Sequence, residues 1–460
     1  MKTIEQHNTK VNVWNMRMIL ILLFGFLLYC ELLGASFVWD DYILVVRNQY
    51  IQDFSHIRQI LTEDLASGAG QQYYFYRPMQ NISYAIDYAL YGLNPFGFHL
   101  TNILLHLAAS LAVFRIFLLF SSNEWEALLA GGLFMIHPIH SSVVSYISSR
   151  ADLLCGVFIF WSFFFFVQSY QLYKRRSLIV SLVLFVMALF SKEYAMIFPV
   201  LVILYHWSRN EGKENYRWAL FAGMTLIFVV FRLVFVDKVL SLNTYNVPVV
   251  SKLPGACVAF WEYARLLFNP AHLHMSYGNF LYSLSNPLVW KGLMLFVLVV
   301  GLTFYLYRRG NQILLKFGLV WYWVGLLPIL IFPVNAFMAE NWLYIPTMGF
   351  VFLLSFLLTK LLDVPKMRIV GCLLIGLIIF SYSYKTKQYL SNWQNEIKLF
   401  SWTAQYAKHN GKVFFNLGNA YLRQGEVSQA VFNYRKALEI NPQIKEAQDA
   451  LDQLSNQTIN

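Results

Sequence analysis

The stretch MILILLFGFLLYCELLGASFVWDD, residues 18–41, decides the fold, because an apolar run ends directly on two adjacent carboxylates. A helix needs about 20 predominantly apolar residues to cross the hydrocarbon core of a bilayer, and this run has the required length. Asp40 and Asp41 therefore stand where a first membrane span ends. A simple connection between two spans does not need paired charges at that point.

The composition extends the membrane interpretation to most of the chain. Of the 460 residues, 58% are hydrophobic and 13% are charged, whereas a soluble protein carries about 25% charged residues. A mean hydropathy of +0.49 predicts many spans. In such a protein the net charge of +11 indicates cytoplasmic loops and lipid head groups, and we expect no nucleic-acid partner. The four cysteines lack metal or redox spacing.

Eleven apolar segments are expected to be membrane spans. The region 177–207 is counted as two short spans, because a single helix of that length would be about 46 Å long. The residues SKEY (Ser191–Tyr194) place a Lys and a Glu at the turn between them. The eleven segments are Arg17–Phe37, His99–Phe120, Trp125–Tyr146, Leu153–Tyr173, Ser177–Phe190, Tyr194–Trp207, Trp218–Val236, Pro287–Tyr307, Ile313–Pro333, Leu343–Leu362 and Arg368–Tyr384.

The basic loops predict the orientation of these spans. With the N-terminus in the cytoplasm, as the basic residues up to Arg17 indicate, every short basic loop is cytoplasmic. Counting Ala256–Leu267 as a span would move two of these loops outside, so we expect this segment along the outer surface. The tail after Tyr384 then lies in a periplasm or lumen. No small-residue cleavage pattern precedes Trp39, so we expect an uncleaved first helix.

The chain changes character after Tyr384, where a soluble helical repeat follows the membrane part. The stretch FFNLGNAYLRQGEVSQAVFNYRKALEINP, residues 414–442, matches the tetratricopeptide helix–turn–helix of about 34 residues. We expect a polytopic membrane domain at 1–384 and a helical tail at 385–460, with one clear repeat at 411–444. The predicted fold class is thus an all-α membrane bundle with a small C-terminal repeat module.

The repeat is expected to pack through small residues. Gly418 and Ala430 stand where its two helices approach each other, and Tyr421 and Tyr434 fill the space between them. One repeat cannot bury its apolar face alone, so further helices are expected on both sides of it. The tail is either a docking surface for an acceptor or partner protein, or a small stabilising cap.

Five motifs, in order along the chain, resemble the transmembrane-and-tetratricopeptide family of O-mannosyltransferases. That family belongs with the polytopic glycosyltransferases of the GT-C fold, which use polyprenyl-phosphate sugars. The motifs are FVWDDYILVVRNQYI (37–51), YRPMQNISYAIDYALYGLNPFGFHLTNILLH (76–106), HPIHSSVVSYISSRADLL (137–154), SKEYAMIFPVLV (191–202) and AENWLYIPTMGF (339–350). The resemblance runs through most of the chain, and the repeat follows where the family has one.

The resemblance implies a GT-C-like hexosyltransferase. Its catalytic carboxylate would lie in the first outer loop, residues 38–98, and would be Asp40 or Asp41. The donor would be a polyprenyl-phosphate sugar, and the acceptor a protein or glycan hydroxyl. Family members commonly read Ala-Glu-Arg-Tyr where this chain has Asn341 and Trp342 after Glu340. Glu340 is counted as a candidate substrate residue on this motif.

The residue types fit this chemistry. A carboxylate can take the proton of an acceptor hydroxyl, and neighbouring carboxylates raise each other's pKa. Alternatively, Asp40 and Asp41 simply end the first helix. If a divalent cation takes part, the oxygen ligands of this pair suit Mg²⁺ or Mn²⁺.

Further candidates lie in the other outer segments. Arg or Lys can hold the donor phosphate, and the candidates are Arg77, Arg150 and Lys192. Their alternatives are structural: Arg77 as a loop anchor, Arg150 paired with Asp152, and Lys192 paired with Glu193. His137 and His140 in HPIH either contact substrate or cap a helix end at Pro138, and a metal site is the third alternative.

Two non-enzyme hypotheses compete with a glycosyltransferase. A transporter or flippase of lipid-linked sugars would show repeated halves with interrupted helices at matching positions, and no such symmetry is visible. A membrane scaffold that only presents the repeat would leave the acidic pair unexplained. Among catalysts, an enzyme that modifies surface glycans without touching protein remains an alternative.

Overall fold

The structure is a computed structural model that describes residues 11–121, 123–172, 174–208, 217–235, 249–278, 282–309, 313–331 and 338–459. Within these residues the regular elements are helices, and no strand occurs among them. The predicted all-α class is therefore confirmed.

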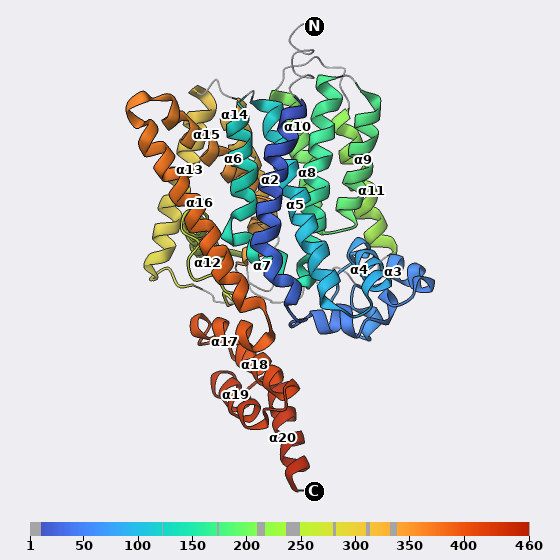
Figure 1. The fold of residues 1–460 in the computed structure, drawn as a ribbon. Helices are drawn as coiled ribbons and strands as arrows, with labels where there is room; N and C mark the ends of the chain where they lie inside the picture. The colour runs from blue at the N-terminus through green and yellow to red at the C-terminus, as the bar shows by residue number, and fades with distance from the viewer. Residues whose placement is uncertain are drawn as a thin grey trace.

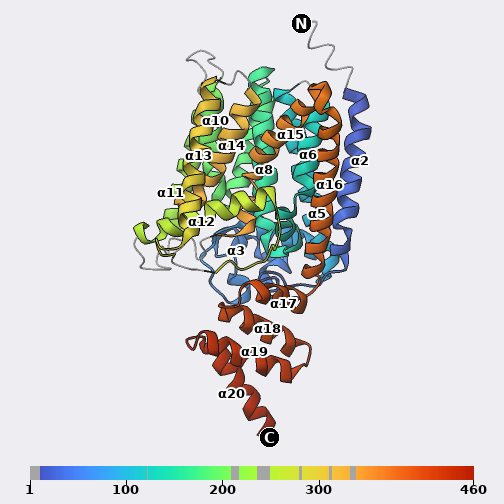
Figure 2. The same cartoon turned by 90° about the vertical axis from the view of Figure 1, so that its left-hand side faces the viewer.

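Long helices form a bundle, and the helices of the tail extend from one end of it (Figure 1). The first long loop, with its short helices α3 (Ile57–Thr62) and α4 (Pro78–Tyr91), lies at the same end as the tail (Figures 1 and 2). The bundle helices are α2 (Val11–Tyr29), α5 (Pro95–Phe120), α6 (Glu124–Ile136), α8 (Arg150–Gln171), α9 (Arg175–Leu189), α10 (Phe198–Ser208), α11 (Arg217–Phe235), α13 (Pro287–Arg309), α14 (Ile313–Ile331), α15 (Thr347–Asp363) and α16 (Arg368–Leu390).

Each of the eleven segments expected to be spans overlaps a helix, and their ends at Tyr173, Val236 and 332–333 lie outside the described residues. Among the described residues, six helices are long and apolar enough to cross a membrane alone, and a bent pair raises the number to seven. Of the other bundle helices, α9 has 15 residues, α10 has 11 and α15 has 17, while α14 has 19 residues with a shorter apolar part at Leu315–Pro328. A membrane bundle with many helices is thus confirmed, while the count of eleven spans stays a prediction.

The segment Trp125–Tyr146, expected to be one span, is broken in the structure. Helix α6 ends at Ile136, and the following short helices, η6 (Pro138–His140) and α7 (Ser141–Ser145), bend away from it by 45°. Pro138 has no N–H to continue the helix, and a residue before proline prefers an extended conformation. His137 adopts that conformation, with φ −65° and ψ 123°.

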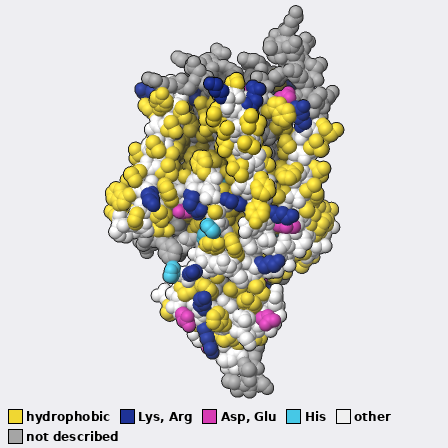
Figure 3. All heavy atoms as spheres, turned by 60° about the vertical axis from the view of Figure 1, so that its left-hand side comes forward, with side chains coloured by type: hydrophobic (Ala, Val, Ile, Leu, Met, Phe, Trp, Pro, Cys, Tyr) yellow, Lys and Arg dark blue, Asp and Glu magenta, His cyan; other side chains and the backbone are white. Residues whose placement is uncertain are grey.

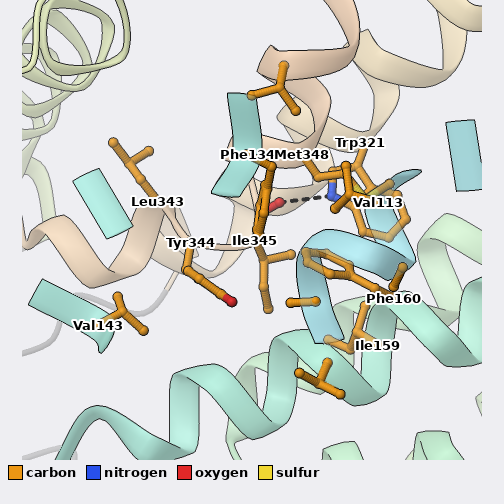
Figure 4. Packing of buried hydrophobic residues seen from close by; sticks show 14 of the residues in the cluster. Val113, Phe134, Val143, Ile159, Phe160, Trp321, Leu343, Tyr344, Ile345 and Met348 are labelled. Carbon is orange, nitrogen blue, oxygen red and sulfur yellow. Dashed lines mark hydrogen bonds between the residues drawn. The ribbon is translucent and has the colours of Figure 1, made fainter. Parts of the chain in front are cut away.

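The core of the bundle lies where α5, α6, α8, α14 and α15 meet (Figure 4). Trp321 on α14 is fully buried there, and its indole N–H donates to the carbonyl of Ile345 at 2.9 Å. Helices α14 and α15 approach backbone to backbone, because a Cβ on Gly349 would collide with the carbonyl of Gly318. Small residues at such crossings are typical of membrane helices.

The surface of the bundle is apolar, as a lipid-facing surface must be. Hydrophobic side chains form a broad band, and Lys and Arg lie along both of its edges (Figure 3). Ile227, Leu298 and Phe380, on three different helices, are each at least 66% exposed. Helix α2 begins at one end of the bundle and α16 ends at the other (Figure 1), which fits an odd number of crossings.

Helix α12 (Val249–Phe268) covers the segment 256–267 that was expected to lie outside the spans. It carries Lys252, Glu262 and Arg265, and it does not meet the criteria for a membrane span. Figure 2 shows α12 crossing α13 instead of running beside it along the bundle. Arg265 and Glu262 pair with each other at 2.6 Å.

The tail consists of α17 (Glu396–Tyr406), α18 (Gly411–Arg423), α19 (Val427–Ile440) and α20 (Lys445–Ile459). A Cβ on Gly418 would lie 2.6 Å from the ring of Tyr434 and 3.2 Å from the carbonyl oxygen of Ala430. The close approach of α18 and α19 at these small residues is therefore confirmed. Helices flank the repeat on both sides, as expected, and Leu390, not Tyr384, ends the last bundle helix.

Candidate active site

The acidic turn, defined here as Val38–Asp41, follows the first span at the end of the bundle that bears the tail (Figure 1). Trp39 has φ +53°, in the left-handed region that a bulky side chain rarely adopts. Such a conformation persists only where surrounding contacts enforce it. The two aspartates of the turn have very different surroundings.

Asp41 is fully buried and holds the turn together. Its Oδ1 accepts hydrogen bonds from the backbone N–H of Ser148 at 2.8 Å and from the Ser148 hydroxyl at 2.5 Å. Its Oδ2 accepts from the backbone N–H of Val38 at 3.0 Å. Burial raises the pKa of Asp41 to about 7, although these hydrogen bonds lower it in part. Asp41 is thus committed to structure on both oxygens.

Asp40 is only partly buried, and its carboxylate receives two tyrosine hydroxyls. Tyr146 donates to Oδ2 at 2.8 Å, and Tyr73 donates to Oδ1 at 3.2 Å. Burial raises the pKa of Asp40, while the hydrogen bonds from Tyr146 and Tyr73 act in the opposite direction. A partly exposed carboxylate with a raised pKa suits a general base better than its buried neighbour does.

Residues 73–77 form a short loop segment. It begins at Tyr73, whose hydroxyl donates to Asp40, and ends at Arg77. Asp64 organises it: Oδ1 accepts from the backbone N–H of Tyr73 at 2.9 Å, and Oδ2 accepts from that of Phe75 at 2.7 Å. Because four residues of chain span at most about 14 Å, Tyr73 and Arg77 stay close together. Asp64 was not singled out in the sequence, since a loop aspartate carries no sign of this role.

Arg77 belongs to a cluster of charged side chains. Its guanidinium lies 3.2 Å from Glu193 and 4.2 Å from the ring centroid of Phe75. The other oxygen of Glu193 accepts from Arg232 at 3.0 Å. The buried Nε of Arg232 has no hydrogen-bond partner in the described structure. Arg232 was missed in the sequence, although an arginine inside an apolar helix is by default a functional candidate.

Lys192 extends this cluster on the other side of Glu193. Its ammonium lies 2.5 Å from Asp152, whose second oxygen accepts from the side-chain amide of Asn341 at 3.2 Å. The alternative pairings of Lys192 with Glu193 and of Arg150 with Asp152 are therefore wrong. Those pairings joined sequence neighbours, whereas the fold brings α8, α11 and two loops together at one place. We call Arg77, Asp152, Lys192, Glu193 and Arg232 the charged cluster.

Arg150 stands apart from the charged cluster and is completely buried. It donates to Asp87 at 2.8 Å, to the carbonyl of Phe98 at 2.7 Å and to Asn102. Its guanidinium also lies 5.1 Å from the ring centroid of Tyr84. These contacts join α8 to α4 and α5. A phosphate-binding role for Arg150 would require several of them to open.

Glu340 is likewise buried among hydrogen-bond donors. Its Oε1 accepts from the hydroxyl of Tyr277 at 2.7 Å and from the backbone N–H of His274 at 2.6 Å, and its Oε2 accepts from Tyr389 at 3.2 Å. Burial raises its pKa to about 7. Glu340 thereby ties the loop after α12 to α16, and the next residue, Asn341, donates to Asp152 of the charged cluster.

His137 and His140 lie at the break between α6 and α7. His137 caps η6: its Nδ1 accepts from the backbone N–H of Ile139 at 3.2 Å, as expected for a helix end at Pro138. His140 pairs through Nδ1 with the carbonyl of Phe134 at 2.7 Å. Within the described residues no three His, Cys, Asp or Glu side chains form a group that could hold a metal ion. A role of either histidine in substrate binding stays a prediction.

The fold therefore gathers some of the predicted residues and separates others. Asp40 and Asp41 lie together, and Arg77 and Lys192 meet in the charged cluster. Arg150 is engaged with α4 and α5, His137 and His140 lie at the break between α6 and α7, and Glu340 ties the loop after α12 to α16. The result is a partly exposed carboxylate connected by one short segment to three cations.

The chain is similar to known proteins over nearly its whole length. It is 24% identical over 448 residues to "Protein O-mannosyl-transferase F38B6.6" of Caenorhabditis elegans, an alignment that covers 90% of this chain and 61% of that protein. It is 23% identical over 462 residues to "Protein O-mannosyl-transferase TMTC3" of Homo sapiens, covering 90% and 50%. The chain thus spans about half to three fifths of the length of these relatives. The family resemblance seen in the five motifs is confirmed.

Two further comparisons are with a family model and with a solved structure. The family model described as "Tetratricopeptide repeat" matches residues 411–444, the bounds expected from the sequence. A solved structure, "Crystal Structure of ArnT from Cupriavidus metallidurans bound to Undecaprenyl phosphate", is similar with a TM-score of 0.44 and 16% identity, over 94% of this chain and 76% of that one.

Proposed function

We propose that the chain is a membrane glycosyltransferase. It moves a hexose, mannose or a close relative, from a polyprenyl-phosphate donor to a hydroxyl acceptor on protein or glycan. One observation carries the proposal: the partly exposed carboxylate of Asp40 is joined through Tyr73 to the charged cluster. Similarity over 90% of the chain to proteins named O-mannosyl-transferases supports the reaction class.

In the proposed reaction Asp40 accepts the proton of the acceptor hydroxyl. The acceptor oxygen forms a bond to the anomeric carbon of the sugar, and the bond from that carbon to the phosphate oxygen breaks. The electron pair leaves with the lipid phosphate, so negative charge grows on it. Tyr73 and Tyr146 orient the carboxylate by donating their hydroxyls to its two oxygens. A positioned base contributes about 10²–10⁴-fold to such a rate.

The charged cluster is proposed to hold the donor phosphate. It contains three cations, Arg77, Lys192 and Arg232, against two carboxylates, Asp152 and Glu193. The excess of one positive charge and the unpartnered Nε of Arg232 make the cluster ready for an anion. Arginine is well suited to this role, because its planar fork binds phosphate through two parallel hydrogen bonds.

A resident metal ion is poorly supported by the residues at the acidic turn. Asp41 uses both oxygens to accept N–H and O–H donors, so a cation bound there would compete with the hydrogen bonds that hold the turn. Dependence on Mg²⁺ or Mn²⁺ stays a prediction from the sequence, and chelation of purified protein followed by re-addition of each ion tests it.

Transfer of radiolabelled sugar from a panel of polyprenyl-phosphate donors tests the proposal. The protein and lipid fractions of the same membranes are counted separately, which identifies the acceptor class. We expect incorporation into protein that is abolished by Asp40→Asn. Movement of labelled lipid across the bilayer without any transfer would instead favour a flippase and overturn the enzyme.

The proposed orientation places the site outside the cytoplasm, with a cytoplasmic N-terminus. Reporter fusions after Gly310, in the basic loop between α13 and α14, and after Asn460 examine this orientation. We expect a cytoplasmic signal at Gly310 and a periplasmic or lumenal signal at Asn460. The same signal at both positions contradicts the three spans expected between Gly310 and Asn460.

A further inference from the structure

The first helix of the tail touches the acidic turn directly. The backbone N–H of Trp39, in its left-handed conformation, donates to Oε1 of Glu396 at 2.9 Å. Glu396 is the first residue of α17, and only 7% of its side chain is exposed. The backbone of Ser36 also donates to the carbonyl of Gln394 at 3.0 Å. The tail therefore stabilises a backbone conformation that the turn would rarely adopt alone.

The other oxygen of Glu396 reaches into the repeat. Its Oε2 accepts from Arg423 at 2.8 Å through Nε and at 2.6 Å through Nη2. Arg423 ends α18, and its guanidinium also lies 4.8 Å from the ring centroid of Tyr42, the residue after the acidic pair. One carboxylate thus joins the turn of the membrane domain to the repeat by charge-assisted hydrogen bonds.

The ring of Trp39 links the tail to Asp40 through Tyr146. It stacks on Tyr146 at 5.5 Å between centroids, with 14° between the ring planes. The hydroxyl of the same Tyr146 donates to Asp40 at 2.8 Å. On its other side, Trp39 meets Phe400 of α17 edge to face at 6.4 Å. Trp39 is therefore held from both sides, between the tail and the tyrosine that orients the candidate base.

We infer that Glu396 and Arg423 form a positioning pair, through which the repeat controls the geometry of the acidic turn. The inference deepens the role of the tail and rests on the proposed function, since it takes Asp40 as the base. Neither residue touches the reacting atoms. Docking of the repeat fixes the backbone conformation and ring position of Trp39. The Trp39 ring fixes the position of Tyr146, and the Tyr146 hydroxyl orients the Asp40 carboxylate. The tail is then a working part of the active site, beyond a cap or an independent docking module.

Loss of either member of the pair should have a specific structural consequence. Removing the Glu396 carboxylate leaves the Trp39 N–H and the Arg423 guanidinium without their acceptor, so the turn loses the contact that enforces its conformation. The Ser36–Gln394 hydrogen bond and the Phe400 contact remain, so the tail stays attached. The variants Glu396→Ala, Glu396→Gln, Arg423→Gln and Arg423→Lys probe the pair. Exposed residues of α19 supply matched controls, Glu439→Ala and Arg435→Gln.

Two measurements on full-length purified protein test the inference. Hydrogen–deuterium exchange over residues 36–42 should be about tenfold faster in Glu396→Ala and Arg423→Gln than in the parent and both controls. Turnover should fall by about tenfold to a hundredfold, with KM for the donor within about twofold, because a misplaced base affects the transition state more than donor binding. Arg423→Lys and Glu396→Gln should recover part of the rate.

The double variant Glu396→Ala with Arg423→Gln separates a shared connection from two independent defects. Its rate should be no lower than that of the worse single variant, because both changes break the same link. Unchanged exchange over residues 36–42 in both single variants overturns the inference, as does a loss confined to donor KM. If exchange rises but Asp40→Asn keeps full turnover, the pair stands as a structural link and the proposed function is the part that fails.

Discussion

The acidic turn and the charged cluster lie at two ends of the same short segment, yet they are built in opposite ways. Both carboxylate oxygens of Asp41 accept hydrogen bonds, and Trp39 is held by contacts from the tail. In the charged cluster, three cations meet two carboxylates, and the buried Nε of Arg232 has no partner among the residues that the structure describes. The first region is made to hold one geometry. We propose that the second receives an anion.

The difference also separates the two adjacent aspartates. Asp41 is fully buried and its carboxylate stabilises the turn, whereas Asp40 is partly exposed. The same substitution should therefore have different consequences at the two positions. A base needs an accessible carboxylate, whereas a structural carboxylate needs buried donors. The largest expected effects below follow from this division.

Asp40→Asn should cause the largest loss of activity. Asparagine keeps the shape of the side chain but cannot take a proton at neutral pH, so turnover should fall by about 10²–10⁴-fold. Donor affinity should change far less, because a base acts mainly in the transition state. Single-turnover rates and donor affinities of purified protein measure this effect. Turnover within a few fold of the parent would leave the turn as a mere helix end.

Asp41→Asn should instead reduce the amount of folded protein. An amide has an N–H₂ group where Asp41 accepts from Val38 or Ser148, so one of these donors loses its acceptor. We expect a lower yield and a lower melting temperature, with turnover per folded molecule closer to the parent than that of Asp40→Asn. The reverse order of the two variants would exchange the assigned roles.

Arg77→Ala and Arg232→Ala should weaken donor binding as well as rate. Removing either cation leaves Glu193 short of one partner and takes away the excess of positive charge. A loss of about tenfold to a hundredfold in kcat/KM, or about 1.4–2.8 kcal/mol, is expected. Arg368→Ala, at the opposite edge of the bundle, is the control. Donor affinity that stays constant in both cluster variants excludes this cluster as the phosphate site.

The last expected effect is the pH dependence of stability that Asp41 contributes. Its pKa is raised to about 7 in the folded protein, above its ordinary value of 3.8, so the folded state binds the proton more tightly. The contribution of Asp41 to stability is then greatest below about pH 4 and is lost as pH rises through 7. Melting temperatures of parent and Asp41→Asn across this range measure it. The destabilisation caused by Asp41→Asn should shrink as pH rises, and a constant difference contradicts the assignment.

The sequence predicted the helices well because their signal is local. A run of apolar residues with caps or basic flanks specifies a membrane helix by itself, and each of the eleven segments overlaps a helix. The repeat was also predictable, since Gly418, Ala430 and Tyr434 are spaced by the geometry of one helical hairpin. The break at Pro138 was predictable as a helix end, but the bend that follows it depends on packing.

Partners across the fold were not predictable, because nothing local specifies them. Lys192 pairs with Asp152, and Glu193 pairs with Arg77 and Arg232, although the sequence offers closer charges to each. Glu396 lies 357 positions from Trp39, with which it shares a hydrogen bond. Pairings of this kind arise only when helices from distant parts of the chain are packed together.

The sequence alone determined that this protein is a bundle of apolar helices with a repeat at its C-terminal end, that an acidic pair follows the first span, and that Arg77 and Lys192 lie in loops near it. Hydrophobicity and residue spacing are properties of short segments, so they survive without a structure. Only the tertiary structure decided that Asp40 is partly exposed and Asp41 is buried, that Arg232 and Arg77 share Glu193, and that the repeat holds the turn through Glu396. Burial, desolvation and hydrogen-bond partnership depend on which surfaces meet, and that is fixed when the whole chain packs.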